Sequence, residues 1–146
     1  MPAQSFSVRL CSWDDARLEA GRIRELVFVR EQGVPKELEW DEQDPRCDHA
    51  LAHAKDGRAV GTGRLLPDGH IGRMAVLKEW RGKGVGALLL QALMEQARLR
   101  GHARVRLNAQ AYAAGFYRRY GFEVSGAEFM EAGIPHVAMQ CDLTRG

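Results

Sequence analysis

Cysteine is scarce in this sequence, and its distribution argues against a protein stabilised by disulfide bonds. The 146 residues include three cysteines, Cys11, Cys47 and Cys141, which are widely spaced and odd in number. Small secreted domains that depend on disulfides carry more cysteines, usually in even numbers. The pattern favours reduced thiols and predicts a cytoplasmic protein.

Long apolar runs and an excess of one charge are also missing. No segment approaches the ~18 consecutive apolar residues that indicate a membrane-spanning helix. Charged residues such as Arg9 and Asp14 interrupt the apolar run that a signal peptide would need. The net charge is +2 and the pI about 8.6, too mild a balance to indicate nucleic-acid binding. We therefore expect neither a membrane nor a nucleic acid as a partner.

Metal-ligand clusters of known spacing are absent as well. Cys47, His49 and His53 follow the spacing C-x-H-x-x-x-H, which matches no established zinc pattern and offers no fourth ligand. We expect structural roles for these side chains, and no metal ion.

The rest of the chain is organised around residues 71–100. A short apolar run of strand type, residues 71–76, leads into the glycine-rich segment 80–86, which suits neither a strand nor a helix interior. Beyond Val85, apolar residues recur at helical spacing, and Gly101 supplies a C-terminal stop. The stretch predicts a strand, a glycine loop and a helix.

A loop of this kind at the start of a helix favours an anion. The first turn of a helix has N–H groups without intrahelical partners and the positive end of the helix dipole. Glycine at positions 82, 84 and 86 lets a phosphate approach that backbone, and Arg81 and Lys83 add positive charge. The alternative is a tight strand-to-helix connection whose glycines only satisfy the turn.

Spacing separates the known phosphate-binding loops. The G-x-x-x-x-G-K-[ST] pattern of a P-loop is absent. Residues 82–87 satisfy G-x-G-x-x-G/A, but no acidic residue occurs at 106–108, where a dinucleotide-binding fold would place one. The chain after Gly86 is also too short for the remaining elements of such a fold, so a dinucleotide-binding protein is the least favoured alternative.

Two motifs at a characteristic separation carry a family resemblance. Arg81-x-x-Gly84-x-Gly86 resembles the R/Q-x-x-G-x-G/A signature of the GNAT superfamily of acyl-CoA-dependent N-acetyltransferases. Residues 113–122 resemble the A-x-x-F-Y-x-x-x-G-F segment of the same family. The ends of the chain, through residues 27–35 and 133–136, are similar to its small bacterial ElaA-like branch.

The resemblance implies a site for acetyl-CoA. In the family, the loop corresponding to Arg81, Gly82, Lys83, Gly84, Val85 and Gly86 binds the pyrophosphate of coenzyme A. The preceding strand splays from its neighbour, so the free backbone groups of Met74, Ala75 and Val76 would bind the pantetheine arm and thioester. Gln110 stands where most members carry an Asn that contacts pantetheine. Tyr117 occupies the position of a tyrosine that can protonate the departing thiolate.

The acceptor amine needs a group that removes its proton. The resemblance at both ends of the chain suggests a shared substrate pocket with Glu31, Gln32 and His136, the last in a loop before the final strand. Histidine changes charge near neutral pH, whereas a carboxylate such as Glu31 would need a raised pKa or a relaying water. Glu131 is a weaker candidate in the same loop.

The apolar patterns outside the loop indicate one α+β or α/β domain spanning residues 1–146. The composition, 45% apolar, is enough for a core. We expect a GNAT fold, with a central, mostly antiparallel mixed sheet of about seven strands and about four flanking helices. Strands are expected at residues 6–10, 49–54, 59–66, 71–76, 105–109, 122–125 and 137–143. Helices are expected at about 12–28, 85–100 and 113–120, and residues 30–46 as a loop or broken helix.

The expected function is therefore transfer of an acetyl group from acetyl-CoA to a primary amine of a small molecule or peptide, in a ternary complex. Six acids in the segment 31–44 would form a negative rim that attracts a cationic amine: Glu31, Glu37, Glu39, Asp41, Glu42 and Asp44. The alternative is a solvated acidic loop. A non-catalytic acyl-CoA sensor or interaction module stays open as a second function, and a homodimer is possible because dimers are common in the family.

Overall fold

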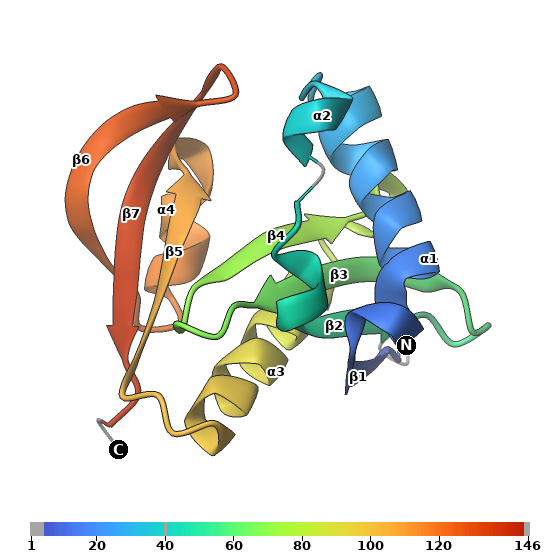
Figure 1. Cartoon of the computed structure of the whole chain (residues 1–146), viewed down its shortest axis with the longest axis horizontal. Coiled ribbons are helices and arrows are strands. Elements are labelled where there is room, and N and C mark those ends of the chain that lie inside the picture. The colour runs from blue at the N-terminus through green and yellow to red at the C-terminus, as the bar shows by residue number, and fades with distance from the viewer. Residues whose placement is uncertain (1–4, 40, 145–146) are drawn as a thin grey trace.

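The computed structural model describes residues 5–39 and 41–144 (Figure 1). Trp40, within the predicted loop, and both ends of the predicted domain lie outside the described residues. The helical elements are α1 (Trp13–Arg24), the π-helical turn η1 (Glu25–Glu31), α2 (Lys36–Glu39), η2 (Asp44–Arg46), η3 (Lys78–Trp80), α3 (Val85–Leu99), η4 (Ala111–Ala113) and α4 (Ala114–Arg118). The strands are β1 (Ser7–Cys11), β2 (Asp48–His53), β3 (Ala59–Leu65), β4 (Ile71–Val76), β5 (Arg104–Gln110), β6 (Glu123–Glu131) and β7 (Ile134–Asp142).

The strands form two sheets rather than one continuous mixed sheet. The first has the order β1-β2-β3-β4 and the second β5-β7-β6, and all pairings within them are antiparallel. A single parallel bridge, between His70 and Arg106, joins the two sheets at one end. Beyond it β4 and β5 diverge (Figure 1). The expected number of strands is confirmed, and the predicted splaying of the strand before the glycine loop is seen.

Helices α1 and α3 pack on opposite faces of the first sheet. Leu89, Leu90 and Leu93 of α3 are fully buried in the main core, whereas Ile23 of α1 packs in a separate cluster against Ala75 of β4. Both helices follow the apolar spacing of the sequence. Ser12 caps the start of α1, because its hydroxyl accepts a hydrogen bond from the Asp15 N–H at 3.4 Å.

The first helix continues past its expected end. After Arg24 the chain takes up π-helical hydrogen bonding through Glu31, with the Gln32 N–H donating to the Val27 carbonyl at 3.0 Å. Such turns are uncommon and often occur at functional sites. Here the wider turn brings Glu31 and Gln32 to the gap between the two sheets.

The last two strands are longer than the sequence indicated. They form a hairpin whose two-residue turn, Ala132 and Gly133, has positive φ at both positions, 51° and 76°. This is the geometry of a tight hairpin turn, but the Ala-Gly sequence lacks the Asn or Asp that usually indicates such a turn. Strand β6 is almost entirely exposed and so shows no apolar alternation. His136 therefore lies within β7, not in a loop before it.

Candidate active site

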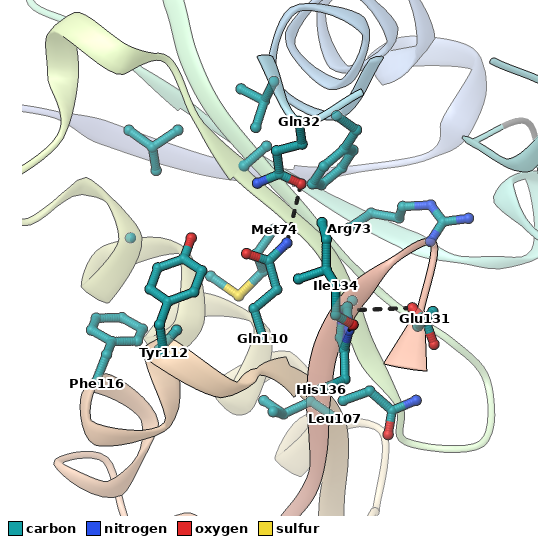
Figure 2. Close-up of a pocket in the computed structure, with 18 of the residues that line it drawn as sticks. Gln32, Arg73, Met74, Leu107, Gln110, Tyr112, Phe116, Glu131, Ile134 and His136 are labelled. Atoms are coloured by element: carbon teal, nitrogen blue, oxygen red, sulfur yellow. Dashed lines mark hydrogen bonds and ion pairs between the residues drawn. The ribbon is translucent and has the colours of Figure 1, made fainter. Parts of the chain in front are cut away.

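A cleft of about 800 Å³ opens where β4 and β5 diverge. Its walls come from β4, β5, the turn η1, the glycine loop, η4 and α4, and the β6–β7 hairpin. Figure 2 shows Tyr112 and Phe116 on one side of this cleft, Arg73 and Glu131 on the other, and Gln110 between them. The volume falls in the range of small-molecule sites.

The glycine loop has the shape expected of an anion site. Gly82 and Gly84 have φ of 78° and 88°, and a Cβ added at either would meet no atom within 4 Å. Gly84 is the left-handed N-cap of α3 and supplies no side-chain cap. Among the described residues, none accepts a hydrogen bond from the backbone N–H groups of residues 82–87. The loop thus offers a set of unpartnered donors at the positive end of a 15-residue helix.

Arg81 is committed to neighbours within the protein. Its Nη1 and Nη2 donate to the Glu31 carboxylate at 2.5 and 2.7 Å, and its Nε donates to the Val76 carbonyl at 2.9 Å. These bonds attach the start of the loop to η1 and to the end of β4. Hydrogen bonding from Arg81 lowers the pKa of Glu31. The raised pKa that direct proton acceptance by Glu31 would require is therefore not found.

The three β4 residues assigned to the thioester lie at the cleft. Ala75 and Val76 pair with Thr62 and Gly61 of β3 on one side only. Their other edge faces the gap, since β5 has already diverged. Met74 lines the same wall. The strand thus has an open edge toward the cleft, although the Val76 carbonyl on it already accepts a hydrogen bond from Arg81. Binding of the thioester by residues 74–76 stays a prediction.

Tyr117 of α4 lines the cleft on the side of β4. Its ring packs edge-on against Phe116 and Phe122, with centroid distances of 5.0 and 5.9 Å, and its hydroxyl lies 4.0 Å from the Met74 sulfur. Burial raises the pKa of Tyr117 to about 12. The phenol therefore carries its proton at neutral pH, and its hydroxyl lies at the cleft wall formed by β4.

A pair of amides spans the gap between the two sheets. Gln110 Nε2 donates to Gln32 Oε1 at 3.1 Å, which joins β5 to the end of η1 (Figure 2). The two residues are 78 positions apart in the sequence. Gln110 thus lies in the cleft, and its amide oxygen is left for another donor.

His136 is placed deep in the cleft by β7. The side chain is 8% exposed and stacks on Phe129 with a centroid distance of 5.9 Å. Its Nδ1 lies 2.7 Å from the Ile134 carbonyl, which can only accept, so Nδ1 carries a hydrogen. In the neutral ring, Nε2 then holds the lone pair, and Glu131 Oε2 lies 3.8 Å from it. This arrangement suits a proton acceptor.

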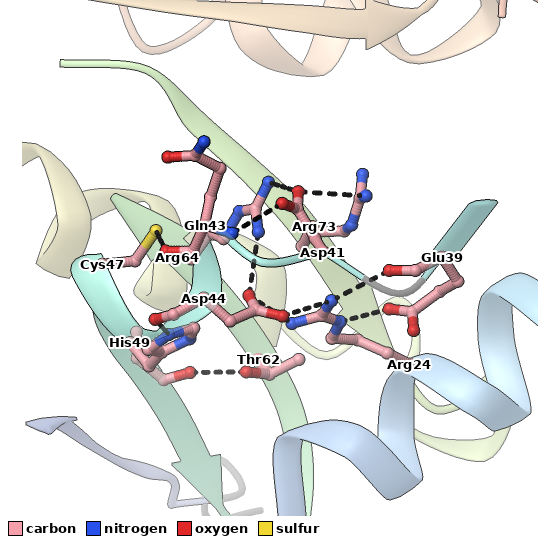
Figure 3. A network of polar contacts seen from close by, with 11 residues as sticks. Arg24, Glu39, Asp41, Gln43, Asp44, Cys47, His49, Thr62, Arg64 and Arg73 are labelled. Atoms are coloured by element: carbon pink, nitrogen blue, oxygen red, sulfur yellow. Dashed lines mark hydrogen bonds and ion pairs between the residues drawn. The ribbon is translucent and has the colours of Figure 1, made fainter. Parts of the chain in front are cut away.

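The predicted acidic rim is wrong for most of its members. Glu39 and Asp44 pair with Arg24, and Asp44 and Asp41 pair with Arg64 (Figure 3). Glu31 pairs with Arg81. Exposed Glu37 and Glu42 are left as the solvated part of the segment. The sequence pattern missed these pairings because the arginines lie on other elements.

Arg73 is a cleft residue that the motifs did not reveal. It lies in β4 between the apolar positions of the strand, and its side chain reaches the cleft wall (Figure 2). A charged residue in an otherwise apolar strand was the available signal. As for metals, no group of three or more His, Cys, Asp or Glu side chains in the described part of the chain could hold an ion.

Comparison with known proteins agrees with this geometry. Residues 25–143 match the family model described as Acetyltransferase (GNAT) domain. The chain is 42% identical over 129 residues to the uncharacterized N-acetyltransferase YjcF of Bacillus subtilis, covering 85% of this chain and 91% of the relative. It is 39% identical over 133 residues to YyaT of the same organism, covering 87% and 89%.

Solved structures share the fold along nearly the whole chain. An acyl-CoA N-acyltransferase from Pseudomonas aeruginosa superposes with a TM-score of 0.84 at 31% identity, covering 94% of this chain and 99% of that one. Escherichia coli ElaA gives a TM-score of 0.84 at 26% identity, covering 94% and 100%. With its glycine loop, splayed strands and matching relatives, the chain belongs to the GNAT family of acetyltransferases, in which it is structurally similar to ElaA.

Proposed function

We propose that the protein transfers an acetyl group from acetyl-CoA to a primary amine by direct attack in a ternary complex. The observation that carries this proposal is the cleft between β4 and β5, with unpartnered loop N–H groups at one end and His136 and Tyr117 along its walls. Bound acetyl-CoA would supply the acyl carbon and a thiolate leaving group. The acceptor is a small molecule or a peptide.

The side chains of the cleft divide the proton transfers. His136 Nε2, with its lone pair fixed by the Nδ1 contact, accepts the proton that the amine must lose. Tyr117, whose phenol is protonated at neutral pH and lines the cleft beside Met74, returns a proton to the departing sulfur. The loop glycines and Lys83 hold the pyrophosphate, the open edge of residues 74–76 holds the thioester, and Gln110 contacts the pantetheine. Arg81 and Glu31 act on the loop by fixing its position.

We also propose that the protein acts in the cytoplasm as a single domain. Cys11, Cys47 and Cys141 are all free thiols, which supports the cytoplasm as the location. No helix among the described residues is long and apolar enough to cross a membrane.

Two conservative substitutions test the assigned roles. Tyr117→Phe removes one oxygen and keeps the packing, so we expect turnover to fall by about 10²-fold or more with little change in acetyl-CoA affinity. His136→Gln keeps a polar group of similar size and should likewise lower turnover. The measurement is thiol release from acetyl-CoA with a panel of primary amines.

The same assay separates an enzyme from a sensor. Wild-type protein that binds coenzyme A yet releases no thiol with any amine would be an acyl-CoA-binding module. Unchanged turnover in Tyr117→Phe would assign that ring to packing alone. Unchanged turnover in His136→Gln would remove the proposed base.

A further inference from the structure

The backbone at Arg73 is unusual for an arginine. Strand β4 has a bulge there, because Arg73 and Met74 lie opposite the single residue Gly63 between the pairs Thr62–Ala75 and Arg64–Gly72. Arg73 has φ of 49°, in the left-handed region that glycine ordinarily occupies at such bulges. Strained residues of this kind gather at functional sites. The bulge turns the Arg73 side chain along the cleft wall.

The guanidinium of Arg73 makes few hydrogen bonds to the described residues of the protein. Its Nη2 makes one long contact, 3.4 Å, to Asp41 Oδ2, an oxygen that accepts from Arg64 Nη2 at 2.6 Å (Figure 3). Its Nε is buried and finds no acceptor among the described residues. A quarter of the side chain, 26%, is exposed. The exposed end of the guanidinium therefore has donors left for a ligand in the cleft, whereas the buried Nε does not reach it.

The charges around Arg73 favour an added anion. Burial lowers the pKa of Arg73, and the nearby charges of Arg64 and Arg24 lower it further, outweighing Asp41 and Glu39. An arginine still stays protonated at neutral pH. The positive charge of Arg73 is thus incompletely neutralised by the acidic groups around it. A ligand carboxylate beside the guanidinium would neutralise the remaining charge.

Other charged groups of the cleft are already engaged. Arg81 is paired with Glu31, and Glu39 is paired with Arg24. Glu131 lies beside His136 on the facing hairpin. Figure 2 shows the Arg73 guanidinium and Glu131 on the same side of the cleft. The cation Arg73 and the proposed base His136 therefore both line the cleft in which the acetyl-accepting amine would bind.

We propose that the acceptor is a small primary amine that also carries a carboxylate, which Arg73 binds while the amine faces His136. This inference rests on the acetyl transfer proposed above. The acceptor is small because the cleft of about 800 Å³ must also admit the pantetheine arm. The chemistry required is that of a free amino acid or a similar amino carboxylate.

Matched pairs of amines test the proposal. Thiol release is measured for tyrosine against tyramine and for tryptophan against tryptamine, which differ by the carboxylate. We expect Arg73→Gly to lower kcat/KM for the carboxylate-bearing members by about 10- to 100-fold and to leave tyramine and tryptamine little changed. The change in ratio on substitution cancels the difference in amine basicity within each pair. Equal effects on both members would overturn the proposal.

The variants are chosen so that folding does not obscure the result. Glycine fits the left-handed φ of position 73 without strain, which offsets the loss of the 3.4 Å contact with Asp41, so Arg73→Gly should remain folded, and its unfolding is measured beside that of wild type. Arg73→Lys keeps the charge and should retain part of the preference. Arg98→Gln removes an exposed arginine of α3 outside the cleft and should leave both ratios unchanged.

A binding measurement decides the role of Arg73 even if none of these amines is acetylated. N-acetyltyrosine and N-acetyltyramine are titrated into protein saturated with coenzyme A. We expect the carboxylate-bearing compound to bind more tightly to wild type, and this advantage to disappear in Arg73→Gly. Equal binding of the two compounds to wild type would overturn the proposal. Absence of thiol release despite coenzyme A binding would instead count against the transfer reaction itself.

Discussion

Asp41 illustrates how one side chain serves several partners at the edge of the cleft. It accepts hydrogen bonds from the Gln43 N–H at 2.8 Å and from Arg64 at 2.6 Å, and it lies 3.4 Å from Arg73. Burial raises the pKa of Asp41, but these hydrogen bonds and the two arginine charges outweigh burial and hold the pKa below its ordinary value. The ionised carboxylate is therefore stabilised by the fold.

The lowered pKa of Asp41 predicts a pH-dependent contribution to stability. The contribution is fully present above the unfolded-state pKa of about 3.9 and is lost as the pH falls through the lower native value. Asp41→Asn should thus be less stable than wild type at neutral pH, and the difference should shrink below about pH 4. Urea unfolding of both proteins across this range measures it. A difference that does not depend on pH would contradict the assignment.

The close contact between β3 and α3 depends on glycine. Strand β3 is buried at all seven positions, and Gly61 faces the helix. A Cβ at Gly61 would lie 2.9 Å from Leu89 Cδ1, 3.0 Å from Val85 Cγ1 and 3.3 Å from the Ala75 carbonyl. Valine is stiff at χ1 and a backbone oxygen cannot rotate away, so neither neighbour yields easily. Strand β3 and helix α3 are held at this distance.

Adding a methyl group at this contact should therefore loosen the fold. We expect Gly61→Ala to lower the free energy of unfolding by about 1–3 kcal/mol through overpacking. Gly72→Ala in β4 is the matched control, because its Cβ would meet no atom within 4 Å and its φ is not positive. Chemical denaturation of both variants makes the comparison. Equal stabilities would show that α3 shifts at little cost.

The molecule as a whole is divided by its cleft. Two antiparallel sheets meet at the His70–Arg106 bridge, and the amides of Gln32 and Gln110 join η1 to β5 across the opening. Coenzyme A bound along this gap would contact both sheets and the loop. Ligand that binds only the folded state stabilises it by mass action.

Coenzyme A should accordingly raise the unfolding temperature. At a concentration 100 times its Kd, the expected gain in unfolding free energy is about 2.7 kcal/mol. Gly86→Val should abolish the gain, since a side chain there fills the space for pyrophosphate. Position 86 does not have a positive φ and a Cβ there would make only an ordinary 3.7 Å contact with Phe116, whereas valine at Gly84 would also strain the backbone. Thermal unfolding with and without ligand tests this, and a shift with adenosine alone would contradict it.

Local patterns in the sequence were enough to predict most of the fold. The strand, glycine loop and helix of residues 71–100 depend on neighbours close in the chain. The family motifs then pointed to the loop, the open edge of β4 and Tyr117. The last two strands were predicted too short, and the turn that joins β6 to β7 was missed, because an exposed strand has no apolar alternation.

The tertiary structure alone decided which charges and amides meet. Arg81 with Glu31, and Gln110 with Gln32, are 50 and 78 positions apart, and no local pattern encodes such pairs. Four of the six acids expected to attract a cationic amine are instead paired with arginines of α1, β3, β4 and the glycine loop. The bulge that gives Arg73 its direction arises from the register of β3 and β4. The sequence alone determined which charged residues are present, but long-range packing decides which of them pair and so sets the electrostatics of the acceptor site.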